Sequence, residues 1–303
     1  MQAGRSIFTW VLVAQILALP ALGQLNWSKD GAWMLAPSDS VCPDGHIPIG
    51  TTTAKGDLSE TLGSCVIKDG SLYKMWYTGI YGNYRIFYAT STDGVNWVKM
   101  NNAIPAASDT VSTYGRIPLG SAGRGDQSHA LYPSVIKDGA TYKMWYTGNN
   151  GANYRIFHAT SPDGLRWTKY DNTVPAASDT TSTGGRIPLG NAGRGDSSYA
   201  FACTVIKDGA TYRMWYTGYN GNYRVYHATS PDGLTWTKYD NTVPVASDTT
   251  SSGGRIPLGT AGRLDVSHAG YPYVTRAGGR YFMFYSGYLG ANWTQTAEAL
   301  SLS

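Results

Sequence analysis

Short runs in which apolar and polar residues alternate, each closed by a glycine or an Asp-Gly pair, follow one another along most of the chain. The clearest copy has runs at 132–139, 141–148, 154–161 and 165–170. β-Branched and aromatic residues, which favour strands, dominate these runs, and Asp-Gly pairs favour tight turns between antiparallel strands. The pattern predicts a four-stranded antiparallel meander of about 40 residues, the size of one blade of a β-propeller.

The same pattern returns about every 70 residues, which is typical of a repeat architecture. Tryptophans mark the fourth run of successive copies, and large aromatic residues mark the second run. The two sets are Trp27, Trp97, Trp167 and Trp236, and Trp76, Trp145, Trp215 and Phe284. Both faces of a blade pack on neighbouring blades, so aromatic side chains at this period are expected in the core. We predict an all-β fold, a β-propeller with four blades of four antiparallel strands.

The two ends of the chain indicate how the ring closes. The last copy ends after its third run, whereas Leu25–Lys29 reads as a fourth run that lacks the other three. An N-terminal strand that completes the C-terminal blade would leave no strand edge open. We expect residues 24–303 to form this single propeller domain.

The first 23 residues have the pattern of a secretory signal peptide. Arg5 gives the positive start, residues 7–19 an apolar core, and residues 21–23 a small-residue cleavage site before Gln24. About 13 apolar residues are too few to span a bilayer, and no later run is longer. We therefore expect a secreted protein, extracellular or periplasmic, with no membrane insertion.

Composition narrows the class of protein further. The 303 residues include 37 Gly, 23 Tyr and 10 Trp, and only 15% are charged, which excludes a disordered chain and a coiled coil. The net charge of +4 is spread over the repeats, so no nucleic-acid partner is expected. Cys42, Cys65 and Cys203 are too few for a disulfide framework, and one disulfide with one free thiol stays open.

Each repeat has roughly 25 residues more than a blade needs, and they fall between the fourth run of one copy and the first run of the next. The segment 175–190 is typical, being rich in Ser, Thr, Gly and Pro, and it predicts an ordered surface loop. Strand alternation places these loops on the same face as the loops between the second and third runs. This long-looped face is where we expect a ligand to bind.

The candidate catalytic and binding residues of the repeat come directly before each first run or at its start. An aspartate recurs there as Asp57, Asp126, Asp196 and Asp265, and three residues later the copies differ, with Glu60, His129, Tyr199 and His268. One interpretation is structural, with each aspartate accepting backbone N–H groups or pairing with a repeated arginine such as Arg116, Arg186 or Arg255. The other is that the aspartates converge on a central funnel and bind sugar hydroxyls together with His129, Tyr199, His268, Arg116, Arg186 and Arg255. No cofactor is expected, although a central cation held by Asp and His stays an alternative.

Two segments carry a family resemblance. Residues 132–148 (YPSVIKDGATYKMWYTG) and 159–167 (ATSPDGLRW) resemble the propeller glycosidase superfamily of arabinanases, levansucrases, invertases and mannoside phosphorylases. The resemblance implies a propeller that handles glycans in a central pocket. Members typically have five blades, whereas four are counted here. The catalytic carboxylate that the resemblance implies before the Pro-Ser-Val segment is replaced by Tyr132 or Tyr271.

Three functions remain open on these grounds. The first is a secreted carbohydrate-active propeller that recognises oligo- or polysaccharides through its long-looped face, because repeated weak contacts gain from multivalency. The second is a glycoside hydrolase with one central site, in which Glu60 is the acid and Asp126 or Asp196 the base, because glycosidases use a pair of carboxyl groups. The third is a structural surface or assembly protein.

Overall fold

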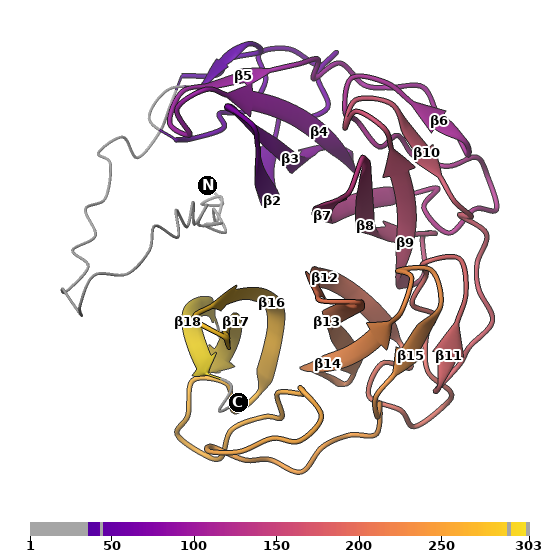
Figure 1. The fold of residues 1–303 in the computed structure, drawn as a ribbon, viewed down its shortest axis with the longest axis vertical. Helices are drawn as coiled ribbons and strands as arrows, with labels where there is room; N and C mark the ends of the chain where they lie inside the picture. Colours follow the sequence, from indigo (N-terminus) through magenta and orange to yellow (C-terminus); the bar gives the residue numbers. More distant parts are fainter. Residues whose placement is uncertain (1–35, 43–44, 290–291, 301–303) are drawn as a thin grey trace, which may run out of the picture.

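The computed structural model describes residues 36–42, 45–289 and 292–300, and this part of the chain is made of strands and loops without a helix. Four antiparallel sheets stand around a common centre, with β2, β7, β12 and β16 closest to it (Figure 1). The predicted all-β propeller with four blades is confirmed. The predicted signal peptide and the closing strand Leu25–Lys29 lie outside the described residues. In the described part, no helix is long and apolar enough to cross a membrane.

The strands of each blade run from the centre outward in chain order. Blade 1 has β2 (Glu60–Asp69), β3 (Leu72–Tyr81), β4 (Asn83–Ser91) and β5 (Trp97–Lys99). Blade 2 has β7 (His129–Asp138), β8 (Thr141–Asn149), β9 (Tyr154–Ser161) and β10 (Trp167–Lys169). Blade 3 has β12 (Tyr199–Asp208), β13 (Thr211–Asn220), β14 (Asn222–Ser230) and β15 (Trp236–Lys238). Blade 4 has β16 (His268–Ala277), β17 (Arg280–Leu289) and β18 (Asn292–Leu300).

A fifth strand, which the sequence pattern did not predict, lies at the outer edge of blades 1 to 3. It has only two residues and comes from the loop that precedes the blade: β1 (Val41–Cys42), β6 (Val111–Ser112) and β11 (Thr181–Ser182). In blade 2, for example, Ser112 pairs with Trp167. The fourth strand has only three residues, so the loop covers an edge that would otherwise be open to pairing with other chains.

Aromatic side chains join neighbouring blades, as the repeat predicts. Trp76 of blade 1 packs edge-on against Trp167 of blade 2, with ring centroids 5.7 Å apart. Trp145 of blade 2 packs in the same way against Trp236 of blade 3, at 5.8 Å. All four indoles are fully buried. These tryptophans therefore belong to the core between blades and not to a sugar-binding surface.

The Asp-Gly turns also connect blades, in addition to closing hairpins. Asp69 accepts hydrogen bonds from Lys74 of its own blade and from Lys137 and Tyr142 of blade 2. Asp138 repeats this arrangement toward blade 3, but blade 4 has Ala277 at the corresponding position. Within the described residues, strand-to-strand packing joins blade 1 to 2, 2 to 3 and 3 to 4.

Candidate functional site

The innermost strand of every blade is kinked at the same point. The register with the second strand shifts there, and one residue adopts a left-handed conformation: Gly63, Tyr132, Ala202 or Tyr271, with φ between 48° and 55°. This conformation is strained for residues other than glycine. In blades 2 to 4 this residue's N–H donates to a buried threonine of the preceding blade, as in the 2.9 Å bond from Ala202 N–H to Thr147 Oγ1. The kink is therefore held by a side chain and repeated around the axis.

Two kink residues meet across the centre of the molecule. The rings of Tyr132 and Tyr271 lie 5.5 Å apart in an edge-on arrangement, and Phe201 lies 5.5 Å from Tyr271. Burial raises the pKa of the Tyr132 phenol well above its ordinary value of 10.0, so it stays protonated. The positions at which the resemblance implies a catalytic carboxylate thus hold neutral, packed aromatic rings.

The residues at which the four copies differ lie on one aromatic wall at the start of the inner strands. The rings of His129 and Tyr154 stack at 6.4 Å, and Tyr154 lies 5.3 Å from Tyr199. His268 lies 4.9 Å from Tyr223 of the preceding blade. Tyr199, Tyr219 and Tyr223 complete the wall, with centroid distances of 5.2 and 4.6 Å. The structure thus brings His129, Tyr199 and His268 onto one surface, which we call the aromatic wall.

Both histidines of the wall are uncharged. Burial lowers the pKa of His129 and of His268, and the positive charges of Arg85 and Arg224 lower these pKa values further. The Nδ1 atoms of both rings accept backbone N–H groups, from Tyr84 at 3.4 Å and Tyr223 at 3.1 Å. The imidazoles are therefore neutral hydrogen-bonding groups at neutral pH.

Glu60 occupies the corresponding position in blade 1, where its side chain is exposed. Its charge, together with burial, raises the pKa of Tyr84, so the carboxylate lies near the Tyr84 end of the wall. Among the sequence-predicted acids, Glu60 is the one that the structure leaves open to solvent.

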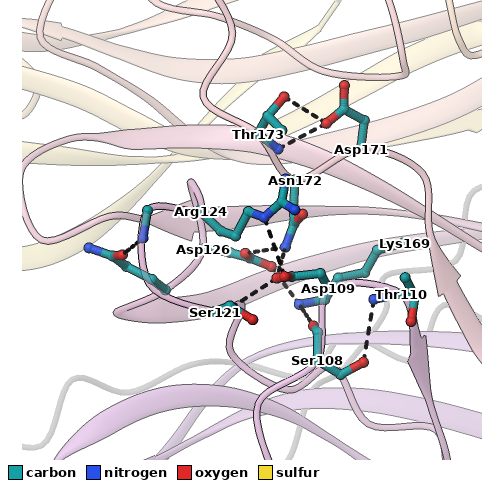
Figure 2. Close-up of polar contacts among 12 residues, drawn as sticks. Ser108, Asp109, Thr110, Ser121, Arg124, Asp126, Lys169, Asp171, Asn172 and Thr173 are labelled. Carbon is teal, nitrogen blue, oxygen red and sulfur yellow. Dashed lines mark hydrogen bonds and ion pairs between the residues drawn. The ribbon is translucent and has the colours of Figure 1, made fainter.

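The repeated aspartates are enclosed in hydrogen-bond networks, and Figure 2 shows the network of Asp126. Asp126 accepts three bonds through its carboxylate, from Lys169 at 2.7 Å and from Tyr146 and Asn172, both at 2.9 Å. Lys169 also donates to the carbonyl oxygens of Ser108 and Pro118, which fixes the preceding loop. Asp57 and Asp196 repeat this network with Lys99 and Lys238.

This geometry argues against the chemical roles expected for the aspartates. Asp57, Asp126 and Asp196 have no exposed area, and Asp265 is half-buried and accepts a 2.8 Å bond from Tyr285. A carboxylate whose oxygens are already bonded inside the protein has no free face for a sugar or a water molecule. We therefore do not assign Asp126 or Asp196 as a base. The structural interpretation fits these residues better, although the partner is a lysine and not the expected arginine.

The three arginines expected to contact ligand stabilise loops instead. Arg186 and Arg255 form ion pairs with Asp171 and Asp240, at 2.8 and 2.9 Å. Arg116 donates to the carbonyl oxygen of Ala103 at 2.9 Å. These contacts join the two ends of one inter-blade loop and do not reach the aromatic wall.

A different set of arginines was not predicted from the sequence. The tripeptide Asn-Tyr-Arg begins at, or one residue before, the third strand of blades 1 to 3, at 83–85, 153–155 and 222–224. Its asparagine binds the next blade, as in the 2.9 Å bond from Asn83 to the Ser128 carbonyl, and its tyrosine belongs to the wall or adjoins it. Its arginine is buried, with 8–9% of its area exposed. A charged residue repeated inside an apolar strand was the signal that could have revealed it.

Other functional groups are sparse in the described part of the chain. Cys42, Cys65 and Cys203 are free thiols, and burial raises the pKa of Cys65 to about 11. No group of three or more His, Cys, Asp or Glu side chains capable of holding a metal ion occurs among the described residues. A shallow groove of about 410 Å³ lies at the outer rim, between Met100, Tyr114 and Leu165. It is formed by the outermost strands and loops and is separate from the wall.

Sequence comparison finds two relatives and no matching family model. The chain is 30% identical over 236 residues to the uncharacterized protein Rv1502 of Mycobacterium tuberculosis strain H37Rv, which covers 74% of this chain and 67% of the relative. The corresponding uncharacterized protein MT1551 of strain CDC 1551 is 29% identical over the same length. The chain belongs to the family of these mycobacterial proteins.

Crystal structures with the same fold come from glycoside hydrolases. A glycosyl hydrolase of Bacteroides ovatus superposes with a TM-score of 0.51 and 19% identity, over 76% of this chain and 61% of its own. A protein of Bacteroides thetaiotaomicron inferred to be a glycosidase has a TM-score of 0.54 and 18% identity, over 78% and 64%. The fold is therefore that of the propeller glycosidases, as the sequence resemblance implied.

Proposed function

We propose that this protein is a secreted carbohydrate-binding propeller that recognises glycans on its long-looped face. The observation that carries the proposal is the aromatic wall, with neutral imidazoles and phenols set among its rings. The flat faces of aromatic rings are electron-rich and attract the C–H groups of a sugar ring, while neutral polar groups bind its hydroxyls. The fold shared with glycoside hydrolases supports carbohydrate as the ligand class.

Binding is favoured over hydrolysis by the placement of the acids. Glycoside hydrolysis usually requires two carboxyl groups about 5–9.5 Å apart on either side of the scissile bond. Asp57, Asp126 and Asp196 are enclosed and bound to lysines, which leaves Glu60 as the acid available on this face among the described candidates. A glycoside hydrolase that uses Glu60 remains the second candidate, because the carboxylate is exposed and the fold is shared with such enzymes.

The test pairs a glycan array with a hydrolysis screen on the mature protein. Wild type, Glu60→Gln and Tyr199→Ala would be compared, with the rim variant Tyr170→Ala as a matched control for loss of a tyrosine. We expect Tyr199→Ala to lose glycan binding. We expect Glu60→Gln to bind glycans, and neither wild type nor Glu60→Gln to hydrolyse them. Turnover by wild type that disappears in Glu60→Gln would instead establish the hydrolase. Equal binding by Tyr199→Ala and Tyr170→Ala would reject the aromatic wall as the site.

A further inference from the structure

Arg85, Arg155 and Arg224 occupy equivalent positions on the third strands of blades 1 to 3, and their charge is not neutralised. No carboxylate lies within ion-pair distance of any of them in the described part of the chain, although many other lysines and arginines there form such pairs. Burial lowers the pKa of all three guanidinium groups, and no carboxylate counteracts that effect; at Arg224 only the Tyr226 phenol opposes it. Burying a charge without a partner is costly, so such residues are rarely kept without a reason.

Their hydrogen bonding is incomplete as well. The Nε atoms of all three arginines, and Nη1 of Arg155, are enclosed without a hydrogen-bond partner among the described residues. Arg85 and Arg224 donate only through Nη1, to the carbonyl oxygens of Asn83 and Asn222 at 3.3 and 3.5 Å. Within the described residues, the Nη2 atoms have no hydrogen-bond partner and are not enclosed, so the tip of each guanidinium reaches solvent.

The nearest repeated aspartate does not supply the missing partner. Arg155 pairs across the sheet with Gly148, and a Cβ atom on Gly148 would meet the side chains of Phe157 and Asp126. The carboxylate of Asp126 is, however, already bonded to Lys169, Tyr146 and Asn172. Blades 1 to 3 thus each contain one neutral Asp–Lys pair and one additional positive charge beside it.

The additional charges lie on the proposed binding face. Asn83 and Asn222, which hold two of the guanidinium groups, are the first residues of β4 and β14, next to the loops of the long-looped face. Arg85 and Arg224 are also close enough to His129 and His268 to lower the pKa of these imidazoles. Arg85 and Arg224 therefore lie near the aromatic wall, and Arg155 holds the equivalent register position in blade 2, opposite Gly148.

We propose that Arg85, Arg155 and Arg224 bind the acidic groups of an anionic glycan, so that the ligand of the aromatic wall carries carboxylate or sulfate groups. The inference rests on the proposed function and names its substrate class. A guanidinium presents paired N–H donors that match the oxygens of a carboxylate or sulfate group. Three copies at the blade period suit a polymer with repeated charges, because linked weak contacts strengthen one another.

The fourth repeat supplies a conservative substitution for the test. Gln295 pairs across the sheet with Gly287, just as Arg155 pairs with Gly148, so the fold accepts glutamine at this register position. We would compare wild type with Arg155→Gln and with the triple variant that also carries Arg85→Gln and Arg224→Gln. Arg166→Gln is the matched control for Arg155→Gln, because Arg166 is exposed on a short turn of the opposite face. Both single variants remove one positive charge.

The ligands are used in matched pairs, polygalacturonate against its methyl ester and dextran sulfate against dextran. We expect wild type and Arg166→Gln to prefer the charged member, and each arginine removed from the face to weaken that binding roughly tenfold. If the arginine variants lose binding to polygalacturonate alone, the acidic group is a carboxylate. If they lose binding to dextran sulfate alone, it is a sulfate. The Tm is expected to hold or rise in the triple variant, because an unpaired buried charge is removed.

The outcomes separate this inference from the proposed function. Equal binding of charged and neutral glycans by wild type would overturn the role of the arginines and leave the carbohydrate site intact. Absence of binding to any glycan would overturn both. A lower Tm in the triple variant with unchanged binding would show that the arginines are structural.

Discussion

The ammonium nitrogen of Lys169 lies 2.7 Å from a carboxylate oxygen of Asp126, and both side chains are enclosed almost completely. Lys169→Met would leave the carboxylate buried without its counter-charge. We expect this variant to lower the free energy of unfolding by about 3–5 kcal/mol, measured by urea denaturation. The double variant Lys169→Met/Asp126→Asn should recover part of the loss. A single variant within about 0.5 kcal/mol of wild type, the range of ordinary surface substitutions, would contradict the buried pair.

Thr147 tests how the kink at the axis is maintained. Its hydroxyl accepts the N–H of Ala202, a residue with φ of 48°, and it is fully buried. Thr147→Val keeps the shape but leaves the N–H without an acceptor, so we expect a loss of about 1–3 kcal/mol in stability. Thr168→Val on an exposed strand position serves as the control and should change stability little. Equal stabilities for the two variants would show that the hydroxyl does not hold the kink.

Buried histidines predict an acid-sensitive fold. Burial, aided by the charge of Lys143, lowers the pKa of His158 from 6.5 to about 3, and burial with Arg213 lowers that of His227 to about 4. The unfolded chain takes up these protons first, so stability is full above about pH 6.5 and falls as the pH drops toward the folded-state values. His158 alone should account for roughly 3 kcal/mol between pH 6.5 and 4.

Blade 1 supplies the variant that checks this pH dependence. Tyr88 stands where blade 2 has His158, and it packs on Trp76 as His158 packs on Trp145. His158→Tyr should therefore fold and should lose stability less steeply in acid than wild type, in thermal melts from pH 7 to 4. Parallel pH profiles for the two proteins would reject the assignment to His158.

The ring closure predicted from the sequence can be tested by a crosslink. In blades 1 to 3 the third and fourth strands pair Thr90 with Val98, Thr160 with Thr168 and Thr229 with Thr237. The same register would pair Leu300 of β18 with Ser28. Cysteines at both positions should form a disulfide under oxidising conditions, because directly paired Cα atoms fall within the bonding range. Mass spectrometry would detect the disulfide. The pair Leu300→Cys/Gln24→Cys is the control, and equal disulfide yields for the two pairs would contradict the register.

Periodicity was sufficient to predict the blades, because each strand is a local pattern closed by its own turn. Trp97, Trp167 and Trp236 begin the fourth strands and are buried, as their spacing implied. The two-residue outer strands were not predictable in this way. Their pairing depends on a partner about 55 residues away, such as Ser112 with Trp167, and two residues have no period of their own.

The candidate site was predicted only in part. The position that differs among the copies does lie on the aromatic wall, at His129, Tyr199 and His268. The aspartates three residues earlier are turned inward, and their lysine partners come more than 40 residues later in the chain. Sequence spacing cannot reveal which of two nearby polar positions faces the core when one lies in a loop and the other begins a strand.

The outer strands change where one building unit of this protein begins and ends. The loop that begins at residue 108 contains β6 and the carbonyl oxygens that bind Lys169, and both contact the strands of blade 2. This loop therefore belongs with the blade that follows it and not with the blade before it. A unit excised or duplicated from residue 108 to residue 172 would keep its outer edge and its Asp126 network together. A unit that instead begins at the first strand of the blade would lose its own outer strand and would separate Asp126 from Lys169 and Asn172. Modular engineering of this propeller should therefore place its junctions after Asn102, Asn172 and Asn241.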